Sequence, residues 1–214
     1  MPARQPNCRL CLVTPPVVDP ATFPAVLKAA LAAGDVATLF VAGEGSPAST
    51  QRVAEVLVPV AQAAGTAAIV VNDTRLLGRA SADGVHIDTG VPDLVSALER
   101  FRGKKIVGAG GVRSRHEAMQ AGERDPDYVF FGKLDGDTAD TIFPKALDLA
   151  SWWSGLAQIP AVVMGGRSLA SALEAAQAGI EFVALRQAVW EHPEGPAAAV
   201  AEANRILAGE VPAW

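Results

Sequence analysis

Cysteine is scarce in this sequence: there are only two, and both lie in the short motif Cys8-Arg9-Leu10-Cys11. Two cysteines cannot supply a disulfide framework for 214 residues, so we expect a protein of the reducing cytoplasm. The Cys-x-x-Cys spacing also occurs at zinc and redox sites, but no second cysteine pair is present to complete a tetrahedral centre. Residues three apart in a strand point to opposite faces, so we interpret the motif as part of a buried strand.

Long hydrophobic runs and an excess of positive charge are also lacking. The most apolar region, 53–71, is interrupted by Glu55, Pro59, Gln62 and Gly65, so the sequence predicts no membrane span. The formal net charge of −5 argues against a general nucleic-acid-binding protein, because such proteins are usually basic. It does not argue against a local basic pocket for a phosphate. Half of the residues are hydrophobic, which is typical of a globular protein with a sizeable core.

Short apolar runs recur along the chain, and nearly all are continuous rather than alternating with polar residues. Continuous runs are typical of strands buried on both faces of a parallel sheet. Their starts are separated by roughly 17 to 33 residues, the spacing of repeated strand–helix units. The predicted strands are Arg9–Val13, Ala37–Val41, Ala67–Val71, Gly84–Ile87, Lys105–Val107, Tyr128–Phe131, Ala161–Met164 and Phe182–Leu185.

Alanine-rich amphipathic segments separate these strands, and several end at a glycine, as helices often do. The predicted helices are Phe23–Ala33, Thr50–Ala64, Pro92–Phe101, Ser114–Ala121, Leu169–Ala178 and Pro196–Ala208, with a helical turn or two at Arg75–Ala80. Eight such units without a linker predict one α/β domain over residues 1–214, a (β/α)8 TIM barrel. An open doubly wound sheet is the alternative. It is disfavoured because "TPPVVDP" stands where Gly-x-Gly-x-x-Gly would follow the first strand.

In a barrel, the residues that follow the strands share one rim, where active sites lie. Gly165 and Gly166 follow the seventh predicted strand, and backbone amides beside a Gly-Gly pair can approach an anion closely. Barrels often bind phosphate in the loops after strands seven and eight. Arg167 and Arg186 can add charge-assisted hydrogen bonds, and Lys133 follows the sixth strand on the same rim. We therefore predict a phosphate site here, with ordinary loop-forming glycines as the alternative.

Polar residues also follow the third and fourth strands. Asn72 and Asp73 follow the third strand, and Asp73 and Asp88 are candidate ligands for Mg²⁺, which binds one or two protein carboxylates together with phosphate oxygens. The alternative for Asn72-Asp73 is a turn that caps a short helix. His86 shares a strand face with Asp88, and it is either a hydrogen-bonded core residue or a catalyst.

Six segments together resemble one family, the thiamine phosphate synthases and the related TenI-like thiazole tautomerases. These segments are "VNDTRLL", "ADGVHI", "IVGAGGV", "DYVFFG", "IPAVVMGGRS" and "VALRQAV", and they occur in the family's order over nearly the whole chain. The resemblance implies a (β/α)8 barrel. It also implies a reaction that joins an aminopyrimidine diphosphate to a thiazole phosphate, releases pyrophosphate and uses Mg²⁺.

Carried over residue by residue, the resemblance implies that Asn72 and Asp73 bind the diphosphate and Mg²⁺, and that Gly165 and Gly166 hold the thiazole phosphate. Other positions depart from the family pattern. Leu39 and Val41 stand at the Gln and Arg of a family Gln-x-Arg-x-Lys, and Val91 stands at the second Mg²⁺ aspartate. The loop "GAGGV" lacks the family's serine, and Lys133 and Thr138 only partly replace a loop rich in Thr and Lys.

Three functions are consistent with this pattern. The first is a thiamine phosphate synthase-like protein with reduced or altered activity. The second is a TenI-like isomerase of a phosphorylated thiazole, although the tautomerase histidine is missing and Arg113 is the nearest residue. The third is a non-catalytic paralogue that binds a phosphorylated ligand. The expected ligand in each case is a small phosphorylated heterocycle or inorganic phosphate. The assembly state stays open, with a homodimer as one alternative.

Overall fold

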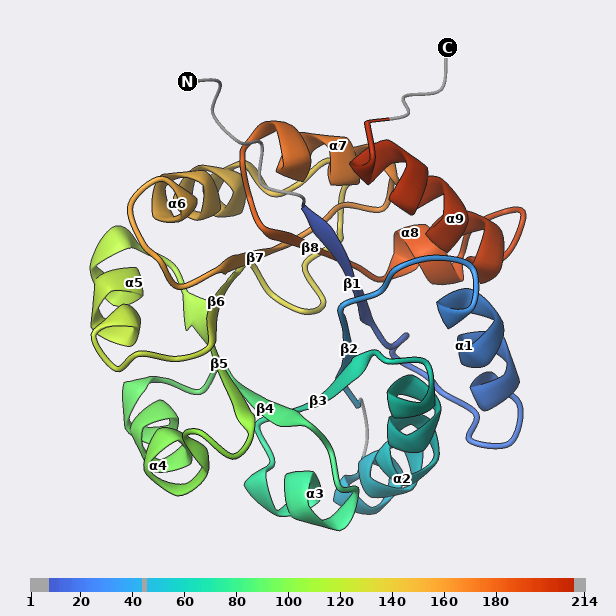
Figure 1. The fold of residues 1–214 in the computed structure, drawn as a ribbon, viewed down its shortest axis with the longest axis horizontal. Helices are drawn as coiled ribbons and strands as arrows, with labels where there is room; N and C mark the ends of the chain where they lie inside the picture. Colours follow the sequence, from blue (N-terminus) through green and yellow to red (C-terminus); the bar gives the residue numbers. More distant parts are fainter. Residues whose placement is uncertain (1–7, 44–45, 210–214) are drawn as a thin grey trace.

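The computed structural model describes residues 8–43 and 46–209, and in them eight parallel strands form a closed barrel. Each strand pairs with the next one along the chain, and the last strand pairs with the first through Arg9–Phe182, Leu10–Val183 and the following residues. Helices surround the barrel on its outside (Figure 1). The (β/α)8 TIM barrel predicted from the sequence is therefore confirmed.

Six of the eight predicted strands have the predicted bounds. The strands are β1 (Arg9–Val13), β2 (Thr38–Val41), β3 (Ala67–Val71), β4 (Gly84–Ile87), β5 (Ile106–Val112), β6 (Tyr128–Phe131), β7 (Ala161–Met164) and β8 (Phe182–Leu185). The largest error concerns β5, which was predicted to end at Val107. The strand continues through a bulge between Ala109 and Val112, where Gly111 adopts a φ of 71°. A bulge with a left-handed glycine prolongs a strand through residues that carry no apolar pattern.

The seven helical segments predicted from the sequence match the structure to within three residues at each end, whereas no bounds were predicted for the helices Pro144–Ser154 and Gln187–Trp190. They are α1 (Phe23–Leu31), α2 (Pro47–Ala63), α3 (Thr74–Arg79), α4 (Val91–Phe101), α5 (Arg115–Gly122), α6 (Pro144–Ser154), α7 (Ala170–Gln177), α8 (Gln187–Trp190) and α9 (Pro196–Leu207). The helix α2 begins three residues earlier than predicted because the Ser46 side chain accepts a hydrogen bond from the Ser49 amide and caps its first turn. No helix in the described ranges is long and apolar enough to cross a membrane.

Side chains alternate between two buried layers along each strand. One layer fills the barrel and contains Phe40, Tyr128, Phe130 and Met164, while a larger layer lies between the strands and the helices. Alternation follows from the two-residue period of a strand, which sends neighbours to opposite faces. The layers therefore decide which residues of each strand can reach the barrel mouth.

The two cysteines of the Cys-x-x-Cys motif belong to different layers. Cys8 packs in the outer layer and Cys11 inside the barrel, and neither forms a disulfide. Burial raises the pKa of each thiol to about 12, so both stay protonated and unreactive at neutral pH. Leu10 and Cys11 are buried in β1, whereas Arg9 is exposed and Cys8 lies one residue before the strand, so the interpretation as a buried strand holds for the second half of the motif.

Candidate functional site

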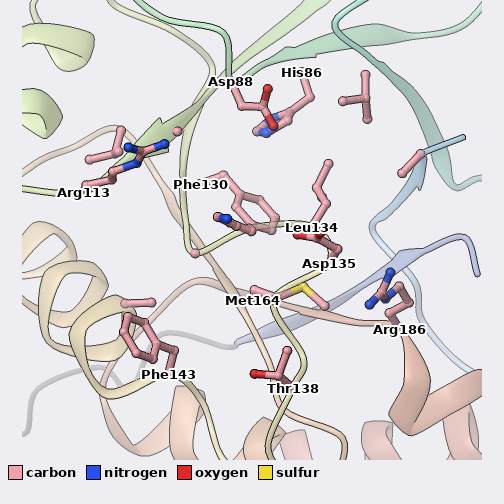
Figure 2. Close-up of a pocket in the computed structure, with 18 of the residues that line it drawn as sticks. His86, Asp88, Arg113, Phe130, Leu134, Asp135, Thr138, Phe143, Met164 and Arg186 are labelled. Atoms are coloured by element: carbon pink, nitrogen blue, oxygen red, sulfur yellow. The ribbon is translucent and has the colours of Figure 1, made fainter. Parts of the chain in front are cut away.

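A pocket of about 890 Å³ opens at the carboxyl ends of the strands. Each of the eight strands contributes a residue at or directly after its carboxyl end to the wall of the pocket: Thr14, Ala42, Val71, Asp88, Gly111, Gly132, Met164 and Arg186. Phe130, Leu134 and Met164 lie in the middle of the pocket, with charged side chains around them (Figure 2). An apolar centre with polar groups at the edge suits a flat ring that carries a charged substituent.

His86 lies at the inner end of this pocket and is held by aromatic neighbours. Its Nδ1 is 3.1 Å from the Tyr128 hydroxyl oxygen, and its ring contacts those of Phe40 and Phe130 edge-on. Burial lowers the pKa of His86 to about 4, although the nearby Asp88 carboxylate acts in the opposite direction. His86 is thus a hydrogen-bonded core residue that stays neutral at neutral pH and also lines the pocket.

Asn72 and Asp88 form a closed pair at the ends of the neighbouring strands β3 and β4. The Asn72 Nδ2 donates to Asp88 Oδ1 at 2.7 Å, and the Asp88 amide donates to Asn72 Oδ1 at 3.0 Å. Asn72 has a φ of 56°, in the left-handed region that asparagine tolerates better than most residues. Asp88 lines the pocket. Asn72 does not line it, but its hydrogen bonds hold the Asp88 side chain in place.

Asp73 has the capping role that was the alternative to metal binding. Its Oδ1 accepts hydrogen bonds from the Arg75 and Leu76 amides at 2.9 and 2.8 Å, which caps α3. Asp73 does not line the pocket, and Val91, at the start of α4, offers no oxygen ligand. In the described ranges no three His, Cys, Asp or Glu side chains are placed to hold a metal ion. The residues present therefore do not build the carboxylate pair that the resemblance implies for Mg²⁺.

The glycine loop after β7 is covered by the chain itself. The Gly165 amide donates to the Ala184 carbonyl at 2.8 Å, the Arg167 amide to the Ala139 carbonyl at 2.8 Å, and the Ser168 amide to the Asp140 carbonyl at 3.3 Å. The prediction that the amides of this loop are open to an anion is therefore wrong for these three groups.

Gly166 is the position where this covering segment passes closest. A Cβ atom on Gly166 would lie within 2.5 Å of the Asp140 carbonyl carbon. The covering residues belong to the β6–α6 loop, residues 132–143, which reaches from β6 across to β7 and β8 (Figure 1). The Gly-Gly pair thus makes room for this loop, and neither glycine lines the pocket.

Arg186, the predicted phosphate ligand after β8, is paired with a carboxylate that the sequence analysis did not single out. Asp137 Oδ1 accepts hydrogen bonds from Arg186 Nε at 3.0 Å and Nη2 at 2.5 Å, and its Oδ2 accepts one from the Gln187 amide at 2.9 Å. The Asp137 side chain is 0% exposed and that of Arg186 is 9% exposed. Three aspartates of one loop, Asp135, Asp137 and Asp140, look equivalent in the sequence, so no pattern marks this one.

Three other cations line the pocket. Lys133 was predicted, whereas Arg113, directly after β5, and Lys145, in the first turn of α6, were not assigned to a binding site. None of the three forms an ion pair within the described ranges. Arg113 and Arg186 lie on opposite sides of the pocket (Figure 2). Helix starts share the rim with strand ends in this fold, and that rule could have identified Lys145 from the sequence.

The alignment of β2 with the family's Gln-x-Arg-x-Lys motif must be shifted by one residue. Leu39 and Val41 pack in the outer layer against the helices, so they cannot occupy positions that contact a ligand in the barrel mouth. The inward residues are Thr38, Phe40 and Ala42, by the alternation along the strand. They carry no charge either, so the absence of a cation from β2 holds in the corrected register.

Comparison with known protein sequences identifies the family of this chain. A sequence model described as thiamine monophosphate synthase matches residues 10–189. The thiamine-phosphate synthase of Rhodospirillum centenum is 39% identical over 207 residues, which cover 95% of this chain and 99% of the relative. That of Hyphomonas neptunium is 35% identical and covers 95% of each chain.

A similar solved structure supports the fold. The thiamine phosphate pyrophosphorylase from Pyrococcus furiosus superposes with a TM-score of 0.74, at 21% identity, over 96% of this chain and 98% of that one. The family match extends over most of the chain and includes every strand from β2 to β8. The chain belongs to the thiamine monophosphate synthase family.

Proposed function

We propose that this protein binds a phosphorylated heterocycle in the pocket at the barrel mouth and carries out the synthase reaction of its family slowly or not at all. The observation that supports binding is the combination of an apolar centre with three cations. Phe130 and Met164 offer surfaces for a ring, while Arg113, Lys133 and Lys145 form no ion pair in the described ranges. A phosphate beside such cations forms charge-assisted hydrogen bonds.

The reduced turnover follows from the groups at the inward face of β2. Release of a diphosphate builds up negative charge, which cations and hydrogen-bond donors must stabilise in the transition state. Thr38, Phe40 and Ala42 supply no positive charge there, and Val91 supplies no carboxylate for a metal. The proposed function therefore includes no step that depends on Mg²⁺.

The binding half of this proposal is tested by calorimetry with thiazole phosphate and with the corresponding thiazole alcohol. We expect the phosphate to bind at least about tenfold more tightly, with the difference reduced at high salt because the cations are solvent-accessible. Lys133→Ala and Lys145→Ala should each reduce the affinity for the phosphate ester and leave that for the alcohol unchanged. Lys28→Ala, on the exposed side of α1, is the matched control and should change neither. Equal affinity for the two ligands would contradict the proposal.

A further inference from the structure

Asp137 occupies a position that has the features of an anion site. Two nitrogens of the Arg186 guanidinium and the Gln187 backbone amide converge on its two carboxylate oxygens. A guanidinium fork with an added amide suits a carboxylate and a phosphate about equally well. The position lies after β8, in the part of the rim where barrels often bind phosphate.

The β6–α6 loop that carries Asp137 is fixed to the body of the barrel at further points. Arg167 donates its amide to the Ala139 carbonyl and places its Nε 3.8 Å from Asp140 Oδ1. The Ile142 amide donates to Glu174 Oε2 on α7 at 3.0 Å. These contacts follow Asp137 in the sequence, and β6 precedes it. The loop is therefore anchored to the barrel both before and after Asp137, which fixes the position of its carboxylate.

We propose that Asp137 is a specificity-determining residue whose carboxylate takes the place of a ligand phosphate at the β8 edge of the pocket. While Asp137 is present, its carboxylate occupies the Nε and Nη2 donors of Arg186 and the Gln187 amide, neutralises the guanidinium charge, and repels a phosphate beside it. Any anionic group of a pocket ligand is therefore directed to the opposite edge, where Arg113 lies (Figure 2). The inference concerns the β8 edge alone and holds whether or not the proposed ligand is the right one.

Removing the carboxylate should convert this edge into a phosphate site. In Asp137→Ala, the buried Arg186 loses its only ion-pair partner in the described ranges and gains space for an anion. The experiment compares melting temperatures in sodium phosphate and in sodium chloride of matched ionic strength. With about 50 mM phosphate and millimolar affinity, we expect Asp137→Ala to melt at least about 4 °C higher in phosphate than in chloride.

The wild type and Asp140→Ala are the controls. Phosphate bound at Arg113, Lys133 or Lys145 should shift both by the same amount, and we expect the shift of Asp137→Ala to exceed theirs by at least about 4 °C. Asp140 belongs to the same loop, but its side chain is 77% exposed, so its loss opens no buried site. A shift in the wild type as large as that in Asp137→Ala would overturn the proposal, as would a folded Asp137→Ala without any shift.

A failure of Asp137→Ala to fold in chloride is also informative. Recovery of its far-ultraviolet circular dichroism on addition of phosphate supports the proposal, because the anion then replaces the missing carboxylate. Asp137→Ser, which leaves a polar group and also opens space, is measured in parallel. Absence of a phosphate effect in both variants contradicts the proposal. A crystal structure of either variant in phosphate should show the anion within hydrogen-bonding distance of Arg186 and the Gln187 amide.

Discussion

His86 and Tyr128 face each other inside the barrel with their rings parallel to within 2° and their centroids 5.8 Å apart. They come from β4 and β6, on either side of β5, and the space they fill is left by two glycines of that strand. A Cβ atom on Gly110 would lie 2.6 Å from His86 Cε1, and one on Gly108 would overlap the Tyr128 ring. Burial raises the pKa of the Tyr128 phenol well above its ordinary value, so the hydroxyl stays protonated beside the imidazole.

The low pKa of His86 predicts acid sensitivity. The folded protein holds His86 neutral with a pKa of about 4, whereas the unfolded chain protonates it near pH 6.5. The stability associated with neutral His86 is thus fully present above about pH 6.5 and is lost as the pH falls towards 4, by on the order of 3 kcal/mol.

The measurement is urea unfolding between pH 7 and pH 4.5 for the wild type, His86→Gln and His116→Gln. The difference in unfolding free energy between wild type and His86→Gln should shrink as the pH falls. His116 is exposed on α5, so His116→Gln should follow the wild type throughout. Parallel pH profiles for wild type and His86→Gln would show that His86 is not the titrating group.

Capping by Asp73 predicts a graded loss of stability. Asp73→Ala removes the acceptor for the Arg75 and Leu76 amides and should lower the unfolding free energy by about 0.5–2 kcal/mol. Asp73→Ser keeps a capping oxygen and should retain most of the stability. Urea unfolding with and without Mg²⁺ checks this, and we expect the same difference in both conditions. A loss that appears only with Mg²⁺ would instead assign Asp73 to a metal site.

Close packing at Gly166 predicts that even a methyl group is disruptive there. Gly166→Ala must displace the backbone of Asp140 and Thr141, and we expect a loss of about 1–3 kcal/mol. Gly78, in α3, is the matched control because a Cβ atom on it meets nothing within 4 Å. Gly78→Ala should be neutral or stabilising by up to about 1 kcal/mol. Equal effects in thermal unfolding would mean that the loop does not cover Gly166 in solution.

The uncharged inward face of β2 predicts weak synthase turnover. If each lost transition-state contact costs about 3 kcal/mol, two or three such losses lower the rate by several powers of ten. The purified protein is incubated with both synthase substrates and Mg²⁺, and thiamine phosphate is quantified by mass spectrometry. The relative from Rhodospirillum centenum serves as the assay control. A turnover number on the order of 1 per second or more would show that the departures from the family pattern are tolerated.

Most of the fold was predictable because parallel barrel strands are buried on both faces and leave continuous apolar runs in the sequence. The end of β5 was not predictable in this way, since Gly110 and Gly111 carry no hydrophobic signal and are held in the strand by a bulge. Which residues of β2 point into the barrel was harder still to predict. A shift of one residue in the match exchanges the inward and outward sets, and Leu39 and Val41 look as suitable for either face as Phe40 does.

The site was predictable as a location but not as a set of contacts. Strand ends place Asp88, Lys133 and Arg186 on one rim from sequence order alone, and the pocket is lined by all three. The partner of Arg186 lies 49 residues earlier, in a loop whose path depends on many weak contacts rather than on any periodic pattern. For the same reason the sequence could not show that the glycines after β7 are covered by their own chain.

The overlap between a Gly108 Cβ atom and the Tyr128 ring restricts the order in which this barrel can change during evolution. Alanine at position 108 is accessible only after position 128 has lost its large ring, and that first step also removes the hydrogen-bond partner of His86. Positions 86, 108 and 128 are therefore expected to vary together among the relatives of this protein. A lineage that retains the tyrosine should retain the glycine as well.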